Sequence, residues 1–428
     1  MSIPICASAS RRFLILTYGS RGDVESLVAL GLGLRQAGHS VRLVAPRPYE
    51  FLAREYNLDF FPLEGDPDQL ALALTDRAGL SWPLMVARMV QHVLPIAAAV
   101  FDRARQAAAE ADVIIHTFLM AEVGHTLAVQ HGLPEFSAQL FPVFAPTSAF
   151  PAVVFPDLPL GAPYRRLTHL LSTAVFRFGG RLLYRRVRAS RPDLPDLAAW
   201  PFAGANGGVR ILFGFSPSVI PPPPDWPGTV AVTGYWHLPP PPGWHPPERL
   251  LEFMRTGPPP IYFGLGSMLT RRLPDLLRNM TEAILSTGQR GMLGAAPEEV
   301  RAADGLGRVI SVADIPHAWL FPQADLVIHH GGAGTTGTAL RAGVPSAAVP
   351  VTADQAFWAR ITRRLGVGPG GPPARRLSTR AAVSMIEGVL SHPHFRRRAE
   401  TLGEALRRED GVATAIRFID NHLERISR

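Results

Sequence analysis

A glycine-rich segment in the second half of the chain has the composition of an anion-binding loop. It reads HHGGAGTT at 329–336 and lies between an apolar run typical of a strand and a helical pattern. Glycine lets the backbone approach a ligand closely, and the free N–H groups at the start of a helix favour an anion such as a diphosphate. His330, Thr335 and Thr336 add side-chain donors. A turn capped by threonine needs fewer small and polar residues than this, so we expect a diphosphate here.

Two more polar segments in this half follow apolar runs typical of strands. Ser267 comes just after the run 261–265. Ligands bind beyond the carboxyl ends of strands in a parallel sheet, so its hydroxyl can donate to the same phosphate. Asp354 and Gln355 follow the run 346–350, and a carboxylate beside an amide can bind the vicinal hydroxyls of a sugar. The alternative interpretations are a common glycine–serine turn and an ordinary helix N-cap pair.

The first half of the chain holds one carboxylate in a comparable place. Asp23 ends the segment GSRGD at 19–23, which follows the apolar run 13–17. We expect it to face a cleft from the N-terminal side. It can equally cap the helix that begins in this segment, and the two roles are compatible.

Strands and helices alternate along both halves, which places these polar segments at strand ends. The run 13–17 is followed by apolar residues at helical spacing, a helix stop at Gly38 and a second strand at 41–45. Further strand-like runs lie at 112–116, 211–215, 261–265, 308–312, 325–329 and 346–350. The amphipathic segment 413–426 is expected to be a helix that closes the C-terminal domain. The alternation predicts an α/β fold with doubly wound sheets.

A proline-rich stretch separates the two halves. It has twelve prolines in the 31 residues 217–247, which excludes a helix or a central strand and predicts a stiff connection. We divide the chain into an N-terminal Rossmann-like domain at 1–237, a linker at 238–248 and a C-terminal Rossmann-like domain at 249–428. Two such halves place a ligand in the cleft between them.

Composition excludes several kinds of chemistry. The 428 residues include 43 basic and 35 acidic side chains, and every basic one is arginine. Without lysine, a Walker A loop, a pyridoxal Schiff base and a lysine nucleophile are excluded. The single Cys6 excludes disulfides, cysteine zinc clusters and a redox pair. Asp66 and Asp68 have the spacing of a metal-binding DxD motif, but they stand alone in a turn, and the histidines have no metal-ligand spacing. There is also no aromatic RNA-binding box, so we expect neither a metal nor a nucleic-acid partner.

One arginine-rich segment suggests a membrane surface. Eight arginines in 165–191 alternate with leucine and aromatic residues. An amphipathic basic helix of this kind can lie on an anionic membrane, although a solvated surface helix is the alternative. No uninterrupted run of 18 apolar residues occurs, so we expect no membrane span. We predict a cytoplasmic protein with peripheral membrane contact through this segment.

Seven motifs in a fixed order over both halves carry a family resemblance. They are GSRGDV at 19–24, SPSVIPPPPDWP at 216–227, TGYW at 233–236, FGLGSM at 263–268, DIPHAWLFP at 314–322, HHGGAGTT at 329–336 and DQAFWARITRRLGVGP at 354–369. With them the chain resembles the family 1 glycosyltransferases of GT-B fold. Within that family it resembles the sterol 3-β-glucosyltransferase-like branch, which is related to macrolide and glycopeptide glycosyltransferases. The implied fold is two Rossmann-like doubly wound domains that face each other across a cleft.

The resemblance also implies roles for individual residues. The C-terminal half would bind a UDP-sugar, with the uracil against the backbone at Ile315. The sugar hydroxyls would be held by Asp354 and Gln355, and Asp23 matches the general base of the bacterial enzymes with a GSRGD motif. The diphosphate would lie against Ser267, His330, Gly332, Gly334 and Thr335, with Thr336 alongside.

The chain departs from the family pattern at three positions. Ser26 and Ala356 replace prolines without a chemical role, and Thr338 stands near the place of a ribose-binding glutamate of plant relatives. Ribose recognition therefore has no assigned residue. The other implied roles are unaffected by these departures.

The expected reaction is an inverting, metal-independent transfer of a hexose, glucose by resemblance, from a UDP-sugar to a hydrophobic acceptor hydroxyl. No cofactor is implied. Acceptor classes include sterols, triterpenoids and related lipids or natural products. The first half has many apolar side chains; many of them are expected in the core, but together they also suit an acceptor pocket, namely Trp82, Met85, Met89, Phe136, Phe141, Phe144, Phe150 and Phe155. The alternatives are a polyketide or macrolide glycosyltransferase that uses a dTDP-deoxysugar, a UDP-sugar epimerase and a noncatalytic sugar-nucleotide binder.

Overall fold

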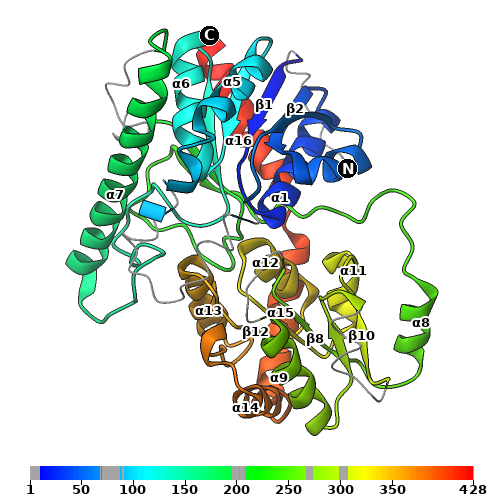
Figure 1. The fold of residues 1–428 in the computed structure, drawn as a ribbon. Coiled ribbons are helices and arrows are strands. Elements are labelled where there is room, and N and C mark those ends of the chain that lie inside the picture. Colours follow the sequence, from blue (N-terminus) through cyan, green and yellow to red (C-terminus); the bar gives the residue numbers. More distant parts are fainter. Residues whose placement is uncertain are drawn as a thin grey trace. The chain divides into compact units, whose positions relative to one another are not determined.

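The chain forms two compact units, each built on a parallel β-sheet (Figure 1). The computed structural model describes residues 10–67, 69, 87–88, 91–194, 202, 208–266, 273–297 and 307–427. Of these, the first unit takes the residues up to Leu238 and those from Asp410 onward, and the second takes Pro239–Glu409. The predicted α/β class with two parallel-sheet domains is confirmed.

The first unit is organised around a seven-stranded sheet with the order β3-β2-β1-β4-β5-β6-β7, all pairs parallel. The strands are β1 (Arg12–Leu16), β2 (Ser40–Pro46), β3 (Asp59–Leu63), β4 (Val113–His116), β5 (Glu135–Gln139), β6 (Arg210–Phe213) and β7 (Val230–Val232). β1 and β4 pair in register, with Ile15 opposite Ile115. Both isoleucines are fully buried, and such continuous apolar strands suit a sheet that is covered on both faces.

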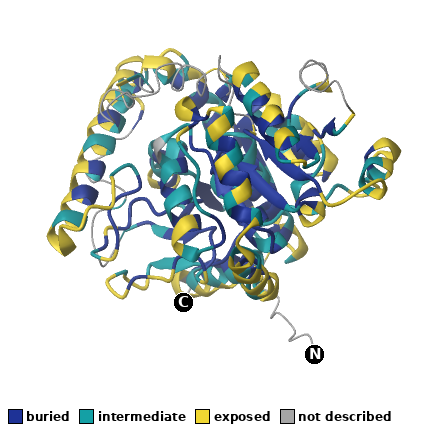
Figure 2. Ribbon diagram, turned by 90° about the horizontal axis from the view of Figure 1, so that it is seen from below, coloured by how far each residue is buried: buried dark blue, intermediate teal, exposed yellow. Residues whose placement is uncertain are grey.

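The helices of the first unit follow its strands along the chain. They are α1 (Arg21–Gln36), α2 (Glu50–Glu55), α5 (Ala97–Ala108), α6 (Ala121–His131), α7 (Gly161–Ser190) and α16 (Gly411–Ser427). Burial is concentrated on the strands and on the inner sides of the helices (Figure 2). Within the described part of the chain, no helix is both long and apolar enough to cross a membrane.

The second unit has a five-stranded parallel sheet with the order β10-β9-β8-β11-β12. The strands are β8 (Ile261–Gly264), β9 (Gly291–Leu293), β10 (Val309–Ser311), β11 (Leu326–His329) and β12 (Ser346–Ala348). The helices are α8 (Glu248–Arg255), α9 (Leu273–Ser286), α11 (His317–Leu320), α12 (Ala333–Ala342), α13 (Ala353–Leu365), α14 (Thr379–Leu390) and α15 (Pro393–Arg408).

Two apolar cores flank the sheet of the second unit. Phe263 and Ile328 belong to a core with α9 and α14, whereas their neighbours Tyr262 and Val327 belong to a core with α8, α11 and α12. Successive strand residues point to opposite faces, so this alternation shows that helices cover both faces. The strand ends are then the accessible places for a ligand.

The proline-rich stretch differs from the predicted continuous connection. Its first part belongs to the first unit, where β7 forms the edge of the sheet next to β6. Trp226 donates its indole N–H to the carbonyl of Ala145 at 3.0 Å, and Trp236 is buried with its indole N–H on Thr233 Oγ1 at 3.0 Å. Residues 228–238 contain no proline, so the edge strand β7 can form there.

The last helix also differs from expectation. The predicted segment 413–426 is helical within α16, but α16 belongs to the first unit and does not close the C-terminal domain. It packs on α1, where a Cβ at Gly33 would overlap the Val412 side chain. Buried His39 faces Asp420 at 3.6 Å. The small side of α1 is thus matched to the apolar face of α16.

We expect Gly33→Ala to lower stability because the new methyl group overlaps Val412. A glycine-to-alanine change in a helix usually stabilises by about 1 kcal/mol, but overpacking costs about 1–3 kcal/mol. Gly22→Ala in the same helix is the matched control, since nothing lies within 4 Å of its Cβ position. Thermal unfolding of both variants checks this. Equal melting temperatures would contradict the docking of α16 on α1.

Candidate functional site

The glycine-rich segment forms the turn between β11 and α12, and His330 is enclosed by glycines there. A Cβ at Gly266 would lie 2.8 Å from His330 Cε1, and one at Gly332 would overlap Nε2. Gly266 follows β8, the strand next to β11, and has a φ of +61°. Only residues without a side chain leave space for the imidazole at both positions. The ring is therefore fixed beyond the carboxyl ends of the two strands.

His330 is neutral at physiological pH. Burial lowers its pKa to about 4, and its Nδ1 has no hydrogen-bond partner within the described chain. The neighbouring His329 is fully buried, burial lowers its pKa to about 3, and its Nδ1 accepts from the Gly331 N–H at 3.1 Å. A neutral imidazole has one N–H to donate. His330 can thus bind an anionic oxygen as a hydrogen-bond donor.

The N-terminus of α12 points its free N–H groups to the same place. The N-cap is Gly332, and no side chain caps the first turn. Half-buried Thr335 and buried Thr336 lie in that turn, Gly334 accepts from Thr338 Oγ1 at 3.0 Å, and Thr336 Oγ1 has no partner in the described part of the chain. The positive end of the helix dipole and the uncapped amides favour an anion.

Asp354 and Gln355 stand at the start of α13, near the glycine-rich turn. A Cβ at Gly331 would lie 2.9 Å from the Gln355 carbonyl oxygen. The Gln355 side-chain oxygen accepts from the backbone N–H groups of Val351 at 2.8 Å and Thr352 at 3.1 Å. The helix-cap interpretation is therefore correct for Gln355. Its amide nitrogen has no hydrogen bond to any described residue and can donate to a ligand.

Asp354 carries the second polar group of this turn. Its Oδ1 accepts from Thr352 Oγ1 at 2.7 Å. Burial raises the pKa of this carboxyl above its usual range, against the lowering effect of that hydrogen bond. An oxygen acceptor and an amide donor thus stand side by side, which suits a pair of hydroxyl groups.

Ile315 and Ser267 are the two other residues predicted to bind the donor, and only Ile315 is among the described residues. Half-buried Ile315 lies between β10 and α11, where its backbone N–H is 3.5 Å from the Val312 carbonyl. It packs against the core of α11 and α12, and it follows β10 at the carboxyl edge of the sheet. Ser267 lies outside the described residues.

Asp23 is fixed near the carboxyl end of β1 in the first unit. Its Oδ2 accepts from the Ser20 N–H at 2.7 Å and from Ser20 Oγ at 2.8 Å, which forms a capping box for α1. A Cβ at Gly19 would lie 2.5 Å from Oδ2. The cap interpretation is thus correct, and Gly19 gives the carboxylate the space it occupies.

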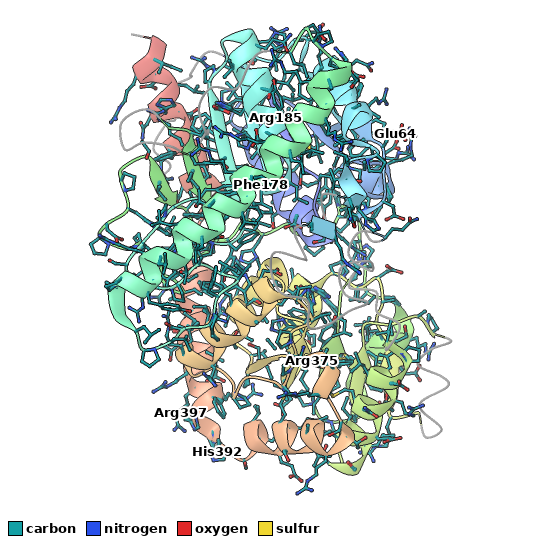
Figure 3. All side chains as sticks on the ribbon, turned by 60° about the vertical axis from the view of Figure 1, so that its left-hand side comes forward. Glu64, Phe178, Arg185, Arg375, His392 and Arg397 are labelled. Atoms are coloured by element: carbon teal, nitrogen blue, oxygen red, sulfur yellow. The ribbon has the colours of Figure 1, made fainter. Side chains whose placement is uncertain are left out.

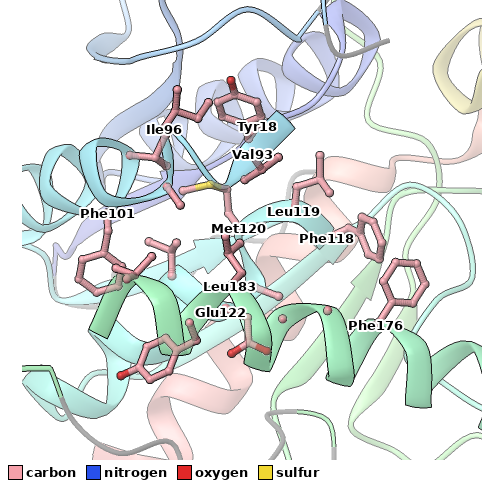
Figure 4. A pocket seen from close by; sticks show the side chains of 18 of the residues that line it. Tyr18, Val93, Ile96, Phe101, Phe118, Leu119, Met120, Glu122, Phe176 and Leu183 are labelled. Carbon is pink, nitrogen blue, oxygen red and sulfur yellow. The ribbon is translucent and has the colours of Figure 1, made fainter. Parts of the chain in front are cut away.

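An apolar cavity of about 120 Å³ opens in the first unit (Figure 4). Its wall includes Tyr18 after β1, Phe118 after β4 and Phe176 on α7. The rings of Phe118 and Phe176 lie edge to face, with their centroids 4.5 Å apart. β1 and β4 are the strands at which the sheet order reverses, the usual place of a ligand crevice.

Sequence reasoning found only part of this wall. Of the apolar residues expected for an acceptor, Phe144 lines the cavity, whereas Phe136 and Phe150 are core residues outside its lining. Trp82, Met85 and Met89 lie outside the described residues. The aromatic residues of the wall come from separate elements, so no spacing in the sequence unites them.

A buried cluster of ionisable groups lies under α6. Glu135 faces His125 Nδ1 at 2.7 Å and His116 Nε2 at 3.4 Å. Burial favours protonated Glu135, but the two histidines outweigh this effect and lower its pKa to about 2. Among the described residues, no group of three or more acidic, histidine or cysteine side chains could hold a metal ion. We assign this cluster to the stability of the unit.

The chain is similar to known proteins in sequence. Residues 275–410 match the family described as erythromycin biosynthesis protein CIII-like, C-terminal domain. An O-mycaminosyltylonolide 6-deoxyallosyltransferase of Streptomyces fradiae is 34% identical over 426 residues, which are 96% of this chain and 98% of that protein. A sterol 3-beta-glucosyltransferase of Arabidopsis thaliana is 31% identical over 434 residues, which are 96% of this chain and 68% of that protein.

The fold is similar to that of a solved structure as well. The glycotransferase of kitacinnamycin matches with a TM-score of 0.69 at 19% identity, over 96% of this chain and 98% of that one. At this identity the likeness concerns the fold. It extends over both units, as the sequence similarity does.

We expect Glu135→Gln to destabilise the first unit at neutral pH. The pKa of Glu135 is lowered from 4.5 to about 2 by folding, so its contribution is fully present above about pH 4.5 and is lost as the pH falls toward 2. At about 1.4 kcal/mol per pKa unit the difference is up to about 3 kcal/mol. Unfolding of wild type and variant between pH 7 and pH 3 checks this, with exposed Glu55→Gln as control. A pH-independent difference would contradict it.

Proposed function

Because the chain belongs to the family 1 glycosyltransferases of GT-B fold, we propose that it transfers a hexose from UDP-glucose to a hydroxyl of a hydrophobic acceptor. One observation supports this above the rest, the neutral His330 held by two glycines beside the uncapped N-terminus of α12. This arrangement offers directed hydrogen-bond donors to a diphosphate. Transfer of a sugar is common to the family, while the donor and the acceptor are our proposal.

The diphosphate is bound by the groups around the glycine-rich turn. His330 and Thr335 donate from their side chains, and the backbone at Gly332 and Gly334 comes close to the phosphates. Thr336 lies alongside, and Ser267 joins the set by family resemblance. As the bond to the sugar breaks, negative charge grows on the diphosphate, and these fixed donors stabilise it. They replace a divalent cation, so we propose that the reaction requires no metal or other cofactor.

The rest of the donor is bound along the carboxyl edge of the same sheet. Asp354 accepts and Gln355 donates hydrogen bonds to the sugar hydroxyls. The base lies against the backbone at Ile315. One missing hydroxyl would be detected only by Asp354 and Gln355, so a dTDP-deoxysugar is the competing donor.

Asp23 is the general base of the proposed reaction. The acceptor oxygen forms a bond to the anomeric carbon while the bond from that carbon to the diphosphate oxygen breaks. The hydroxyl proton passes to Asp23, and the nucleoside diphosphate leaves with the electron pair, which inverts the configuration. A fixed carboxylate within hydrogen-bond reach supports such a proton transfer.

The apolar cavity of the first unit is the proposed acceptor site. Its aromatic and aliphatic wall suits a sterol, a triterpenoid or another natural product. The relative from Streptomyces fradiae, named for a deoxyallosyl transfer, favours a macrolide-type acceptor with a deoxysugar donor as the second candidate. An epimerase has no use for an acceptor cavity, so the cavity favours transfer. The intact Asp23 argues against a noncatalytic binder.

The outer face of α7 is the proposed site of peripheral membrane contact for a cytoplasmic enzyme. The helix has seven arginines and no acidic residue. Large apolar residues are exposed between the arginines, namely Leu167 (51%), Leu170 (63%), Leu171 (47%), Phe178 (72%) and Leu182 (42%). Phe178 and Arg185 mark this face in Figure 3. An apolar stripe with flanking cations suits an anionic lipid surface.

A transfer assay tests the function. Purified protein is incubated with UDP-glucose, or with dTDP-deoxysugars, and a panel of sterols, triterpenoids and polyketide alcohols, and products are read by mass spectrometry. We expect a hexose mass shift on a hydrophobic alcohol. Asp23→Asn should lower the rate at least about 100-fold, because general-base catalysis contributes about 10²–10⁴, while UDP affinity stays within about threefold.

Glu25→Gln is the matched control, since it removes a carboxylate of the same helix that pairs with Arg21. It should transfer at the wild-type rate. Normal transfer by Asp23→Asn would overturn the base assignment, and conversion of the donor sugar without acceptor would favour an epimerase.

Vesicle sedimentation tests the membrane contact. We expect the protein to bind phosphatidylserine vesicles, with weaker binding at high salt because each arginine contributes about 1 kcal/mol near such a surface. The double variant Leu170→Glu, Phe178→Glu should lose most of this binding. Val129→Glu, at a residue on α6 that is 51% exposed, is the control and should bind normally. Equal binding of all three proteins, or none by wild type, would refute the contact.

A further inference from the structure

Charge is rare in the wall of the apolar cavity of the first unit. Of the 19 described residues that line it, Glu122 alone carries a formal charge. The others are apolar side chains, glycines and two tyrosines. Figure 4 shows Glu122 at the start of α6, beside α7. A carboxylate in such surroundings is costly unless it is paired.

Glu122 has no such partner among the described residues. Its carboxylate makes no hydrogen bond and no ion pair with any of them. Two groups act electrostatically on this carboxylate, His125 on its own helix and Arg181 on α7. His125 is engaged by Glu135 at 2.7 Å, and Arg181 is exposed to solvent. Burial accordingly raises the pKa of Glu122 above its usual range, against the opposing effect of these two groups.

The opposite wall leaves space for this carboxylate. Gly179 and Gly180 lie in the middle of α7 and line the cavity. A Cβ at Gly180 would lie 2.5 Å from Glu122 Oε1. Glycine in a helix interior is unfavourable relative to alanine, so Gly180 is explained by the clearance that it provides for the carboxylate.

We propose that the acceptor carries a basic amino group on an otherwise apolar skeleton and that Glu122 binds its ammonium group. This rests on the proposed function only in taking the cavity as the acceptor site. A hydroxyl group would satisfy one lone pair and leave the charge uncompensated, whereas an ammonium group supplies both a hydrogen bond and the opposite charge. Within the range of acceptors proposed above, Glu122 thus favours amine-bearing natural products over neutral ones such as sterols.

Two rigid adamantane derivatives of the same shape, one with an amine and one with a hydroxyl, test this inference without any donor sugar. Binding of 1-adamantanamine and 1-adamantanol is measured by calorimetry at pH 7.5. We expect wild type to bind the amine at least about tenfold more tightly. Glu122→Gln should bring the two affinities within about threefold. Glu110→Gln, which removes an exposed carboxylate outside the cavity, should keep the wild-type preference.

Folding of the key variant is checked by thermal unfolding. Since burial raises the pKa of Glu122, its charge lowers stability at neutral pH, and the glutamine variant should melt no lower than wild type. Gly180→Ala provides a second test, because its methyl group displaces the carboxylate. It should also lose the amine preference.

Three outcomes would overturn the inference: equal affinity of wild type for both adamantane derivatives, no binding of either, or a preference that persists in Glu122→Gln. Failure of the proposed transfer is a separate result. It would show as an absence of glycosylated product in the mass-spectrometric assay, even if the amine preference is present.

Discussion

The parallel hydrogen-bond ladders of the two sheets fix where chemistry can take place. The strand order reverses beside one central strand in each unit, between β1 and β4 and between β8 and β11. Connections leave such a point in opposite directions, so a crevice opens beyond the carboxyl ends. Asp23 and the cavity follow the first pair of strands, whereas Gly266 and His330 follow the second. The direction of the parallel strands thus determines at which edge of each sheet the candidate groups lie.

Glycines near the candidate groups then leave space that fixes the position of neighbouring side chains. The volume beside Gly19 is taken by the Asp23 carboxylate, that beside Gly266 and Gly332 by the His330 ring, and that beside Gly180 by Glu122. Glycine loses more conformational entropy on folding than other residues, and burying an ionisable group carries a further cost. The buried Glu122 carboxylate therefore lowers stability at neutral pH, whereas Asp23 caps α1 and adds to stability.

Much of the fold was predictable because buried parallel strands are apolar runs that end at glycine or polar residues. The glycine-rich turn was predictable from composition alone. Four strands were missed. β9 has three residues, β7 lies within the proline-rich stretch, β5 mixes polar and apolar residues, and β3 contains an aspartate and a proline. The docking of α16 and the space around Glu122 depend on contacts between segments that are distant in the sequence. A single glutamate in a helix forms no sequence pattern, so neither feature could be predicted.

The return of the chain to the first unit changes how the protein can be dissected. The second unit, Pro239–Glu409, is an insertion into the first, because α16 completes the unit with which the chain began. A fragment that ends at Leu238 would leave the surface of α1 around Gly33 uncovered and prone to aggregate. Chimeras that exchange donor halves between relatives should therefore be cut at both crossings, with α16 kept with its own N-terminal half.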